Sequence, residues 1–185
     1  MSKVLITTVP FGEKNRLPLE QLETAGIEYL INPLNKKLTE NELADMIADF
    51  DVIIAGTESI SNYVMERASK LKMISRVGIG LDSVDLLAAE RRGIKVSYTP
   101  DAPAPAVAEL TIGLLIMLLR SAQLSNIEMH KGKWKRYFGK RIANTTIGVI
   151  GLGRVGVRVL NRIAAFGTPR LLVNDIVPNS DIDRK

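Results

Sequence analysis

The most chemically suggestive segment is residues 147–156, IGVIGLGRVG, an apolar run that leads into three glycines. Gly151 permits a tight turn, Gly153 lets a backbone approach a pyrophosphate, and Gly156 lets a helix pack closely on a strand. Asp175 follows nineteen residues after the last of these glycines, about where an acid accepts hydrogen bonds from an adenosine ribose. These spacings predict a strand, turn and helix that bind a dinucleotide.

The composition excludes several other kinds of chemistry. Among the 185 residues, 46% are hydrophobic, one is histidine and none is cysteine, so disulfides, thiolate sites and multi-histidine zinc sites are excluded and no metal is expected. The longest apolar stretch, 110–119, has about half of the ~20 residues that cross a bilayer. The N-terminus lacks the pattern of a signal peptide. We therefore expect a cytoplasmic protein that has no membrane partner.

A basic cluster at 131–141, KGKWKRYFGKR, alternates cationic with aromatic residues. Such a pattern occurs in nucleic-acid grooves, where affinity falls steeply with salt. We expect instead a connecting loop, whose residues Trp134, Tyr137 and Phe138 anchor on the core while its charges are solvated or attract an anionic cofactor. No nucleic-acid partner is predicted.

Strand-like and helix-like runs alternate through the first hundred residues. Strands are expected at 4–8, 27–31, 51–56, 72–77 and 94–99, and helices between them at 17–26, 38–50, 61–70 and 83–93. Alternation of this kind is typical of βαβ units, whose parallel sheet is covered on both faces. We predict a flavodoxin-like doubly wound sheet with strand order 2-1-3-4-5.

The proline-rich segment Thr99–Pro105, TPDAPAP, is expected to be a stiff extended passage. We place the boundary between two domains here, at 1–100 and 101–185. A long buried helix is expected at 106–119, followed by a polar, basic connection; its apolar part, 110–119, is alternatively a helix that faces an oligomer partner, and both can hold at once. One βαβ unit then comprises residues 145–151, 154–166 and 170–175.

Four segments together resemble the D-isomer-specific 2-hydroxyacid dehydrogenases, the family of phosphoglycerate dehydrogenase and glyoxylate or hydroxypyruvate reductase. They are residues 71–100, 106–120, 132–134 and 145–175. A single GxGxxG motif is weak evidence, whereas four segments in the right order and spacing are strong. The resemblance implies an α/β protein, with a flavodoxin-like substrate domain followed by an incomplete Rossmann NAD-binding domain.

The resemblance also assigns cofactor-binding residues. Arg154 and Val155 match loop positions whose backbone meets the NAD pyrophosphate at a helix N-terminus. The other expected cofactor-binding residues are the three glycines and Asp175. The charge of Asp175 would repel a 2′-phosphate, and the next residue, Ile176, is not a basic residue that could bind one. NAD is therefore expected rather than NADP.

In the turn VGIGLD, Ile79 and Gly80 match positions whose backbone faces the substrate carboxylate and the nicotinamide. Gly78 and Gly80 would permit this close approach. Two departures from the family pattern, Asp82-Ser83 for Asp-Asn and TPD for TPG at Asp101, are interpreted as local turn chemistry away from the cofactor contacts.

The catalytic arginine, histidine and glutamate of the family lie downstream of Lys185, so no catalytic residue is assigned. His130 precedes the glycine loop and is interpreted as a surface histidine, while Asp82 and Asp85 are interpreted as caps of a helix start. Only ten residues follow Asp175. We therefore expect a truncated chain that is inactive alone, binds NAD weakly, and dimerises or aggregates through the open edge of its short sheet.

The expected function is transfer of a hydride between NAD(H) and a D-2-hydroxy or 2-oxo acid, such as 3-phosphoglycerate, by a homodimer. The alternative is a non-catalytic NAD-binding or dimerisation module, like the corepressors related to this family. A corepressor would be expected to carry a peptide-binding groove in its first domain, and no such groove is visible in the sequence.

Overall fold

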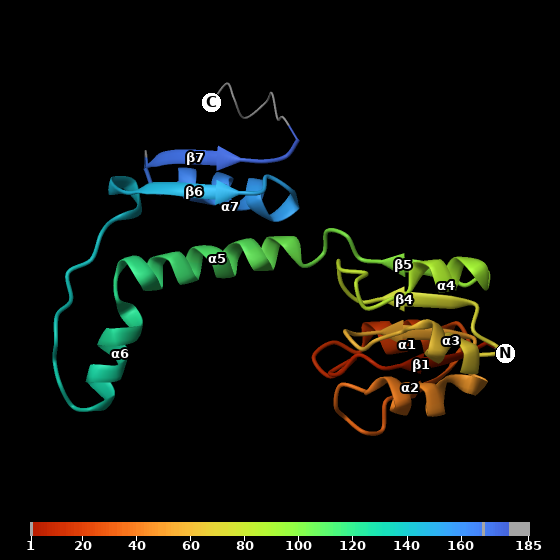
Figure 1. Ribbon diagram of the computed structural model, residues 1–185. Helices are drawn as coiled ribbons and strands as arrows, with labels where there is room; N and C mark the ends of the chain where they lie inside the picture. Colours follow the sequence, from red (N-terminus) through yellow and green to blue (C-terminus); the bar gives the residue numbers. More distant parts are fainter. Residues whose placement is uncertain (1, 168, 178–185) are drawn as a thin grey trace. The chain divides into compact units, whose positions relative to one another are not determined.

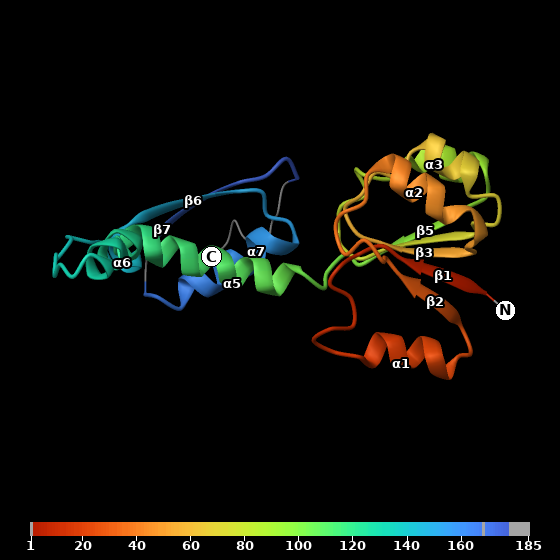
Figure 2. The ribbon, with the colours of Figure 1, turned by 90° about the horizontal axis from the view of Figure 1, so that it is seen from below.

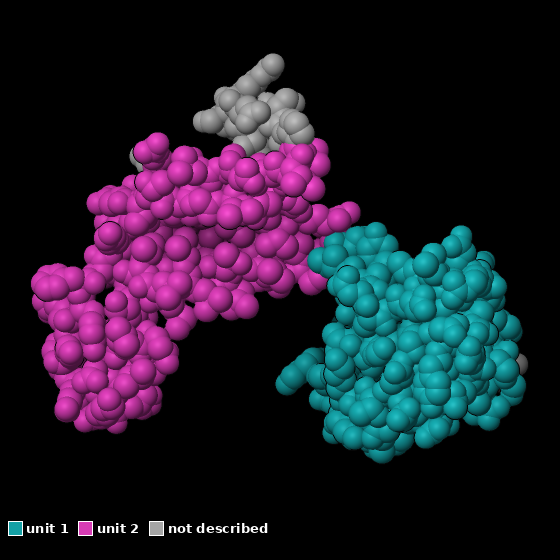
Figure 3. All heavy atoms as spheres, in the orientation of Figure 1, with its two compact units in different colours: residues 1–100 teal, residues 101–185 magenta. Residues whose placement is uncertain are grey.

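The computed structural model describes residues 2–167 and 169–177 (Figure 1). The chain divides into two compact units, Met1–Pro100 and Asp101–Lys185 (Figure 3). Each unit has its own hydrophobic core.

The first unit contains a five-stranded parallel sheet in the order β2-β1-β3-β4-β5. This is the predicted flavodoxin-like order, which is confirmed. Each strand is four residues long, slightly shorter than predicted. The strands are β1 (Lys3–Ile6), β2 (Glu28–Ile31), β3 (Val52–Ala55), β4 (Met73–Arg76) and β5 (Lys95–Tyr98).

Helices cover both faces of this sheet, as Figure 2 shows for α1 on one side and α2 and α3 on the other. They are α1 (Leu17–Thr24), α2 (Glu40–Met46), the 3-10 turn η1 (Ile47–Asp49), α3 (Asn62–Arg67) and α4 (Leu86–Arg91). Successive side chains of a strand point to opposite faces. Accordingly, Val4 and Ile6 pack with Leu19 of α1, whereas Leu5 belongs to the larger core, which also contains Leu43 of α2.

Local chemistry sets the ends of these helices. Thr39 and Glu42 form a reciprocal capping box at the start of α2. Gly26 and Gly93 follow α1 and α4 with positive φ, +66° and +67°, as helix C-termini often require. Asp85 caps α4 by accepting from the backbone amide of Ala88 at 2.9 Å.

The described part of the second unit contains three α-helices, two of which pack closely together, and a two-stranded parallel sheet. Residues Ala108, Ile112, Ile142, Val159 and Ile163 form its buried core. The elements are α5 (Ala104–Leu119), α6 (Ala122–His130), η2 (Ile142–Asn144), β6 (Thr146–Ile150), α7 (Arg154–Ala164) and β7 (Arg170–Asn174).

Several predictions for this unit were wrong. The proline-rich segment is not extended throughout, because Ala104 and Pro105 already form the first turn of α5, where a proline needs no amide partner. The helix expected to be buried exposes much of its surface, with only Ala104, Ala108 and Ile112 buried. The reason is that α7 covers one narrow stripe of it.

The basic connection also differs from its prediction, since its first part is the helix α6. Ser121, with φ +50°, separates α6 from α5. The prediction that aromatic side chains anchor this loop on the core is wrong as well. Trp134 and Phe138 are 81% and 103% exposed, and of the three predicted anchors only Tyr137 is half-buried. Among the described residues no single helix is long and apolar enough to cross a membrane, although α5 and α6, bent by 67° at their junction, meet that test together.

Candidate functional site

The glycine loop joins β6 to α7 and has the geometry that its glycines require. Gly151 has φ +91°, and its amide donates to the carbonyl of Asn174 at 2.8 Å. A Cβ on Gly156 would lie 1.9 Å from the carbonyl oxygen of Gly151, so no side chain fits there. At Gly153, the N-cap of α7, a Cβ would meet nothing within 4 Å. The loop therefore leaves open space beside the helix N-terminus, and this fits the approach of a phosphate group.

Asp175 lies at the end of β7 beside this loop. Its Oδ2 accepts a hydrogen bond from the backbone amide of Leu152, and its Oδ1 accepts one from Val177 at 2.8 Å. These amides, that of Val177 first, lower the pKa of the Asp175 carboxyl. The carboxylate is thus held ionised at the edge of the glycine loop. Its role in holding the loop was not foreseen from the sequence.

Positive charge gathers on the first turns of α7. The exposed Arg154 places its Nε 3.9 Å from Oδ1 of Asp101, and Arg158 donates to Oδ2 of Asp101 at 2.8 Å. The interpretation that Asp101 lies away from the expected cofactor contacts is therefore wrong. Val155, by contrast, packs against the core of the second unit, so only its backbone is free for a ligand.

The turn after β4 holds the residues expected to face the substrate. Gly78 has φ +145°, and a Cβ there would lie 2.6 Å from Nη1 of Arg76. Its amide donates to the hydroxyl of Thr99 at 2.8 Å, which fixes the turn against the end of β5. Ile79 and Gly80 follow and are exposed. A Cβ on Gly80 would make ordinary contact with Asp82, so the fold itself does not require glycine at that position.

A hollow of about 200 Å³ lies beside this turn, at the carboxyl ends of β1, β3 and β4. In the order 2-1-3-4-5, β1 and β3 flank the topological switch point, where open α/β sheets bind ligands. The hollow was not predicted from the sequence. Its lining residues are Thr7, Thr8, Val9, Lys37, Gly56, Thr57, Glu58, Arg76 and Val77.

Two buried charged side chains line this hollow. Glu58 is 2% exposed, and its Oε1 accepts from the amide of Gly56 at 2.9 Å and from the hydroxyl of Thr7. Arg76 is 9% exposed; it donates to the carbonyl of Val77, while its Nε has no partner among the described residues. The signal in the sequence was a charged residue at the end of a buried strand, which is rare without a function or a partner.

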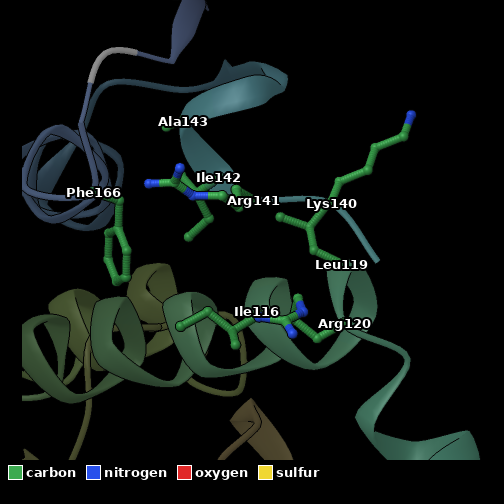
Figure 4. A pocket seen from close by; sticks show the side chains of 8 residues that line it. All are labelled: Ile116, Leu119, Arg120, Lys140, Arg141, Ile142, Ala143 and Phe166. Atoms are coloured by element: carbon green, nitrogen blue, oxygen red, sulfur yellow. The ribbon is translucent and has the colours of Figure 1, made fainter. Parts of the chain in front are cut away.

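A second hollow, of about 230 Å³, lies in the second unit (Figure 4). It is at the C-terminal end of α7, far from the glycine loop at the other end of this eleven-residue helix. Its walls are mainly apolar, and its cationic residues belong to the end of α5 and to the segment before η2. The lining residues are Ile116, Leu119, Arg120, Lys140, Arg141, Ile142, Ala143 and Phe166.

The described residues contain no group of three or more acidic or histidine side chains that could hold a metal ion. His130 is exposed in the last turn of α6. The two regions that offer ligand-binding geometry are therefore the glycine loop with Asp175, and the carboxyl ends of β1, β3 and β4 with the turn at Gly78.

Residues 4–174 match the family described as D-isomer specific 2-hydroxyacid dehydrogenase, catalytic domain. The chain is 42% identical to D-3-phosphoglycerate dehydrogenase of Methanocaldococcus jannaschii over 70% of its own length and 25% of that protein. It is 35% identical to hydroxypyruvate reductase of Thermotoga maritima over 80% of its length and 49% of that protein.

Among solved structures, the cofactor(NAD+)-bound 3-phosphoglycerate dehydrogenase of Entamoeba histolytica superposes with a TM-score of 0.79. It has 28% sequence identity, and the match covers 97% of this chain and 56% of that one. The chain thus spans about half, or less, of the length of these relatives. From its α/β fold, the match over residues 4–174 and these relatives, the chain belongs to the family of D-isomer-specific 2-hydroxyacid dehydrogenases.

Proposed function

We propose that this chain supplies the dinucleotide-binding loop and part of the substrate site of an NAD-dependent oxidoreductase, which interconverts a D-2-hydroxy acid and a 2-oxo acid. The observation that carries the proposal is the glycine loop. It combines open space at Gly153, a helix N-terminus and the ionised Asp175 within one βαβ unit. The enzymatic relatives favour this function over that of a corepressor-like module.

The loop residues would bind the two halves of the adenosine diphosphate differently. Backbone amides at Gly153, Arg154 and Val155 begin α7, where unpaired amides and the helix dipole favour the pyrophosphate. Each carboxylate oxygen of Asp175 accepts one backbone amide, and each has further lone pairs for the ribose hydroxyls. Because this acid is ionised, it would repel a 2′-phosphate, so NAD is favoured over NADP.

The first unit would hold an anionic substrate. Ile79 and Gly80 are exposed in the turn after β4, so their backbone would be open to a ligand. The adjacent hollow contains the buried Arg76 with its unpartnered Nε, and Lys37. These donors suit the carboxylate of a small 2-hydroxy or 2-oxo acid.

NAD, when bound, supplies the hydride acceptor or donor. The residues of this chain would bind and orient the two reactants, which removes much of the entropic barrier to their encounter. No described residue is assigned as the acid or base, and none of the proposed steps uses His130.

We also propose that the chain forms a homodimer through α5 and α6. Both helices expose large apolar side chains to an extent that is unusual for a free surface. Leu118 is 80% exposed and Leu110 is 64% exposed. A second copy would cover them, because a symmetric dimer buries the same apolar surface on both partners. The exposed residues are Val107, Leu110, Leu114, Ile116, Met117, Leu118, Leu124, Ile127 and Met129.

The proposed function is tested by calorimetric titration of the chain with NAD, NADP and ADP-ribose. We expect binding of NAD and ADP-ribose, with NADP at least tenfold weaker. Gly153→Ala should weaken NAD binding at least tenfold because its methyl occupies the phosphate space. Gly148→Ala, where a Cβ also meets nothing within 4 Å but which lies within β6, should not. Equal affinity in the two variants would contradict the proposed site.

A further inference from the structure

The carboxylate of Asp101 lies close to the start of α7, where the pyrophosphate is proposed to bind. Its two carboxylate oxygens point to two arginines of α7: Oδ2 is 2.8 Å from Nη2 of Arg158, and Oδ1 is 3.9 Å from Nε of Arg154. Arg158 also donates through Nη1 to the carbonyl of Arg154 at 2.8 Å. One acid is therefore connected to both cationic side chains of the first turns of α7.

Without Asp101 the start of α7 would be a strongly positive surface. The first turn of α7 carries no acidic residue, and the unpaired amides add a positive dipole end. Arg154 is 57% exposed at its side chain, so it is free to reach a ligand beside Gly153. A carboxylate 3.9 Å from this guanidinium lies on the side from which a phosphate oxygen would pair with it.

We propose that Asp101 is a positioning residue that competes with the dinucleotide pyrophosphate for Arg154. In the free chain the carboxylate attracts the Arg154 side chain across 3.9 Å toward the segment that precedes α5. When a pyrophosphate binds, Arg154 must exchange this partner for a phosphate oxygen, and the remaining charge of Asp101 opposes the ligand. The acid thereby lowers dinucleotide affinity and speeds release. This inference rests on the proposed function, because it assumes that the pyrophosphate binds at Gly153.

The size of the effect follows from the exposure of the pair. Exposed ion pairs contribute about 0.2–1 kcal/mol, which corresponds to a change in affinity of about 1.4- to fivefold. Removal of the Asp101 charge should therefore strengthen binding by about 1.4- to fivefold at low salt. The effect should shrink at 0.5 M salt, where charges more than a few ångströms apart are screened.

The chain offers a matched control in the pair between Glu109 and Arg162. It joins α5 to α7 at 3.0 Å, and Arg162 lies eight residues beyond Arg154 along α7, away from the glycine loop. Glu109→Gln removes one negative charge that is paired with an arginine of α7, as Asp101→Asn does. The two variants change the net charge equally, but only Asp101 lies beside Arg154.

The experiment measures binding of ADP-ribose and NAD by calorimetry, and ADP-ribose dissociation by stopped flow. It uses the full chain as wild type, Asp101→Asn, Glu109→Gln, Arg154→Gln and the double variant Asp101→Asn/Arg154→Gln. We expect Asp101→Asn alone to bind more tightly and release more slowly, and this gain to vanish when Arg154 is also replaced.

Each other outcome overturns a different statement. Equal affinity of wild type and Asp101→Asn, with binding intact, overturns the inference and leaves the proposed function standing. An equal gain in Glu109→Gln, or a gain that persists without Arg154, shows a general effect of net charge and also overturns the inference. Absence of binding in every variant overturns the inference together with the proposed function.

Discussion

Replacement of Gly156 by alanine should destabilise the second unit and leave the stability of the first unit unchanged. Gly156 lies in the first turns of α7, directly against the loop that follows β6. The added Cβ would lie 1.9 Å from the carbonyl oxygen of Gly151, whereas contacts under 3.0 Å are essentially never seen. The helix must therefore retreat from the loop by about 1.1 Å, the difference between these distances. A flexible side chain cannot relieve this contact, because the obstructing atoms belong to the backbone.

The magnitude follows from two opposing effects. Overpacking costs about 1–3 kcal/mol, and a backbone obstruction places Gly156→Ala at or above the upper end. Alanine favours the helix over glycine by about 1 kcal/mol, so the net destabilisation of the second unit is at least about 2 kcal/mol. For a domain of 60–100 residues, this lowers the melting temperature by about 8–16 °C.

Hydrogen exchange and thermal unfolding together measure this prediction. Amides of β6, α7 and β7 should lose protection in Gly156→Ala, while those of β1 to β5 keep theirs, because the first unit has its own core. Gly148→Ala, which meets no atom within 4 Å, should leave the melting temperature unchanged or slightly raised. The reasoning is refuted if both alanine variants melt within 2 °C of the wild type.

Three further predictions concern other parts of the chain. The pKa of Glu42 is lowered to about 2, first by the hydrogen bond from Lys36 and then by those from Thr39. The ionised Glu42 therefore contributes fully to stability above the ordinary pKa of 4.5, and this contribution is lost as the pH falls toward 2. The urea midpoint of Glu42→Gln should lie below that of the wild type at pH 6 and approach it at pH 3. An equal difference between the two midpoints at both pH values would contradict this. Leu118→Lys should convert the proposed dimer to a monomer in light scattering, whereas a dimer of unchanged size would place the interface elsewhere. Asp175→Asn should reduce the preference for NAD over NADP at least tenfold in calorimetry, and a preserved preference would remove the proposed role of that charge.

The features that the sequence predicted best are those fixed by local backbone chemistry and by alternation. Strand order follows from short apolar runs separated by helical patterns, and the five strands of the first unit have the predicted order. Positive φ at Gly151 and close packing at Gly156 follow from a motif whose residues are adjacent in the chain. Such features depend on few distant contacts.

The features that the sequence missed depend on what lies opposite each residue. Hydropathy marks Leu110–Leu119 as apolar but does not say which neighbour covers it, and α7 covers only the stripe around Ala108 and Ile112. The prediction that Trp134 anchors on the core failed for the same reason, because an aromatic residue type does not show whether a neighbour covers it. The hollow at Arg76 needs three strands brought side by side, so neither its shape nor the pairing between Asp101 and Arg154 could be derived from spacing alone.

The separation of α5 from α7 along the chain affects events on the ribosome. The two helices pack together, yet α5 ends at Leu119 and α7 begins at Arg154. At about 5–20 residues per second, some 2–7 seconds of synthesis pass between them, during which α5 lacks the helix that covers Ala108 and Ile112. In that interval, residues 110–119 are the longest apolar stretch of the emerging chain, and they are the segment that a chaperone specific for apolar segments would bind first.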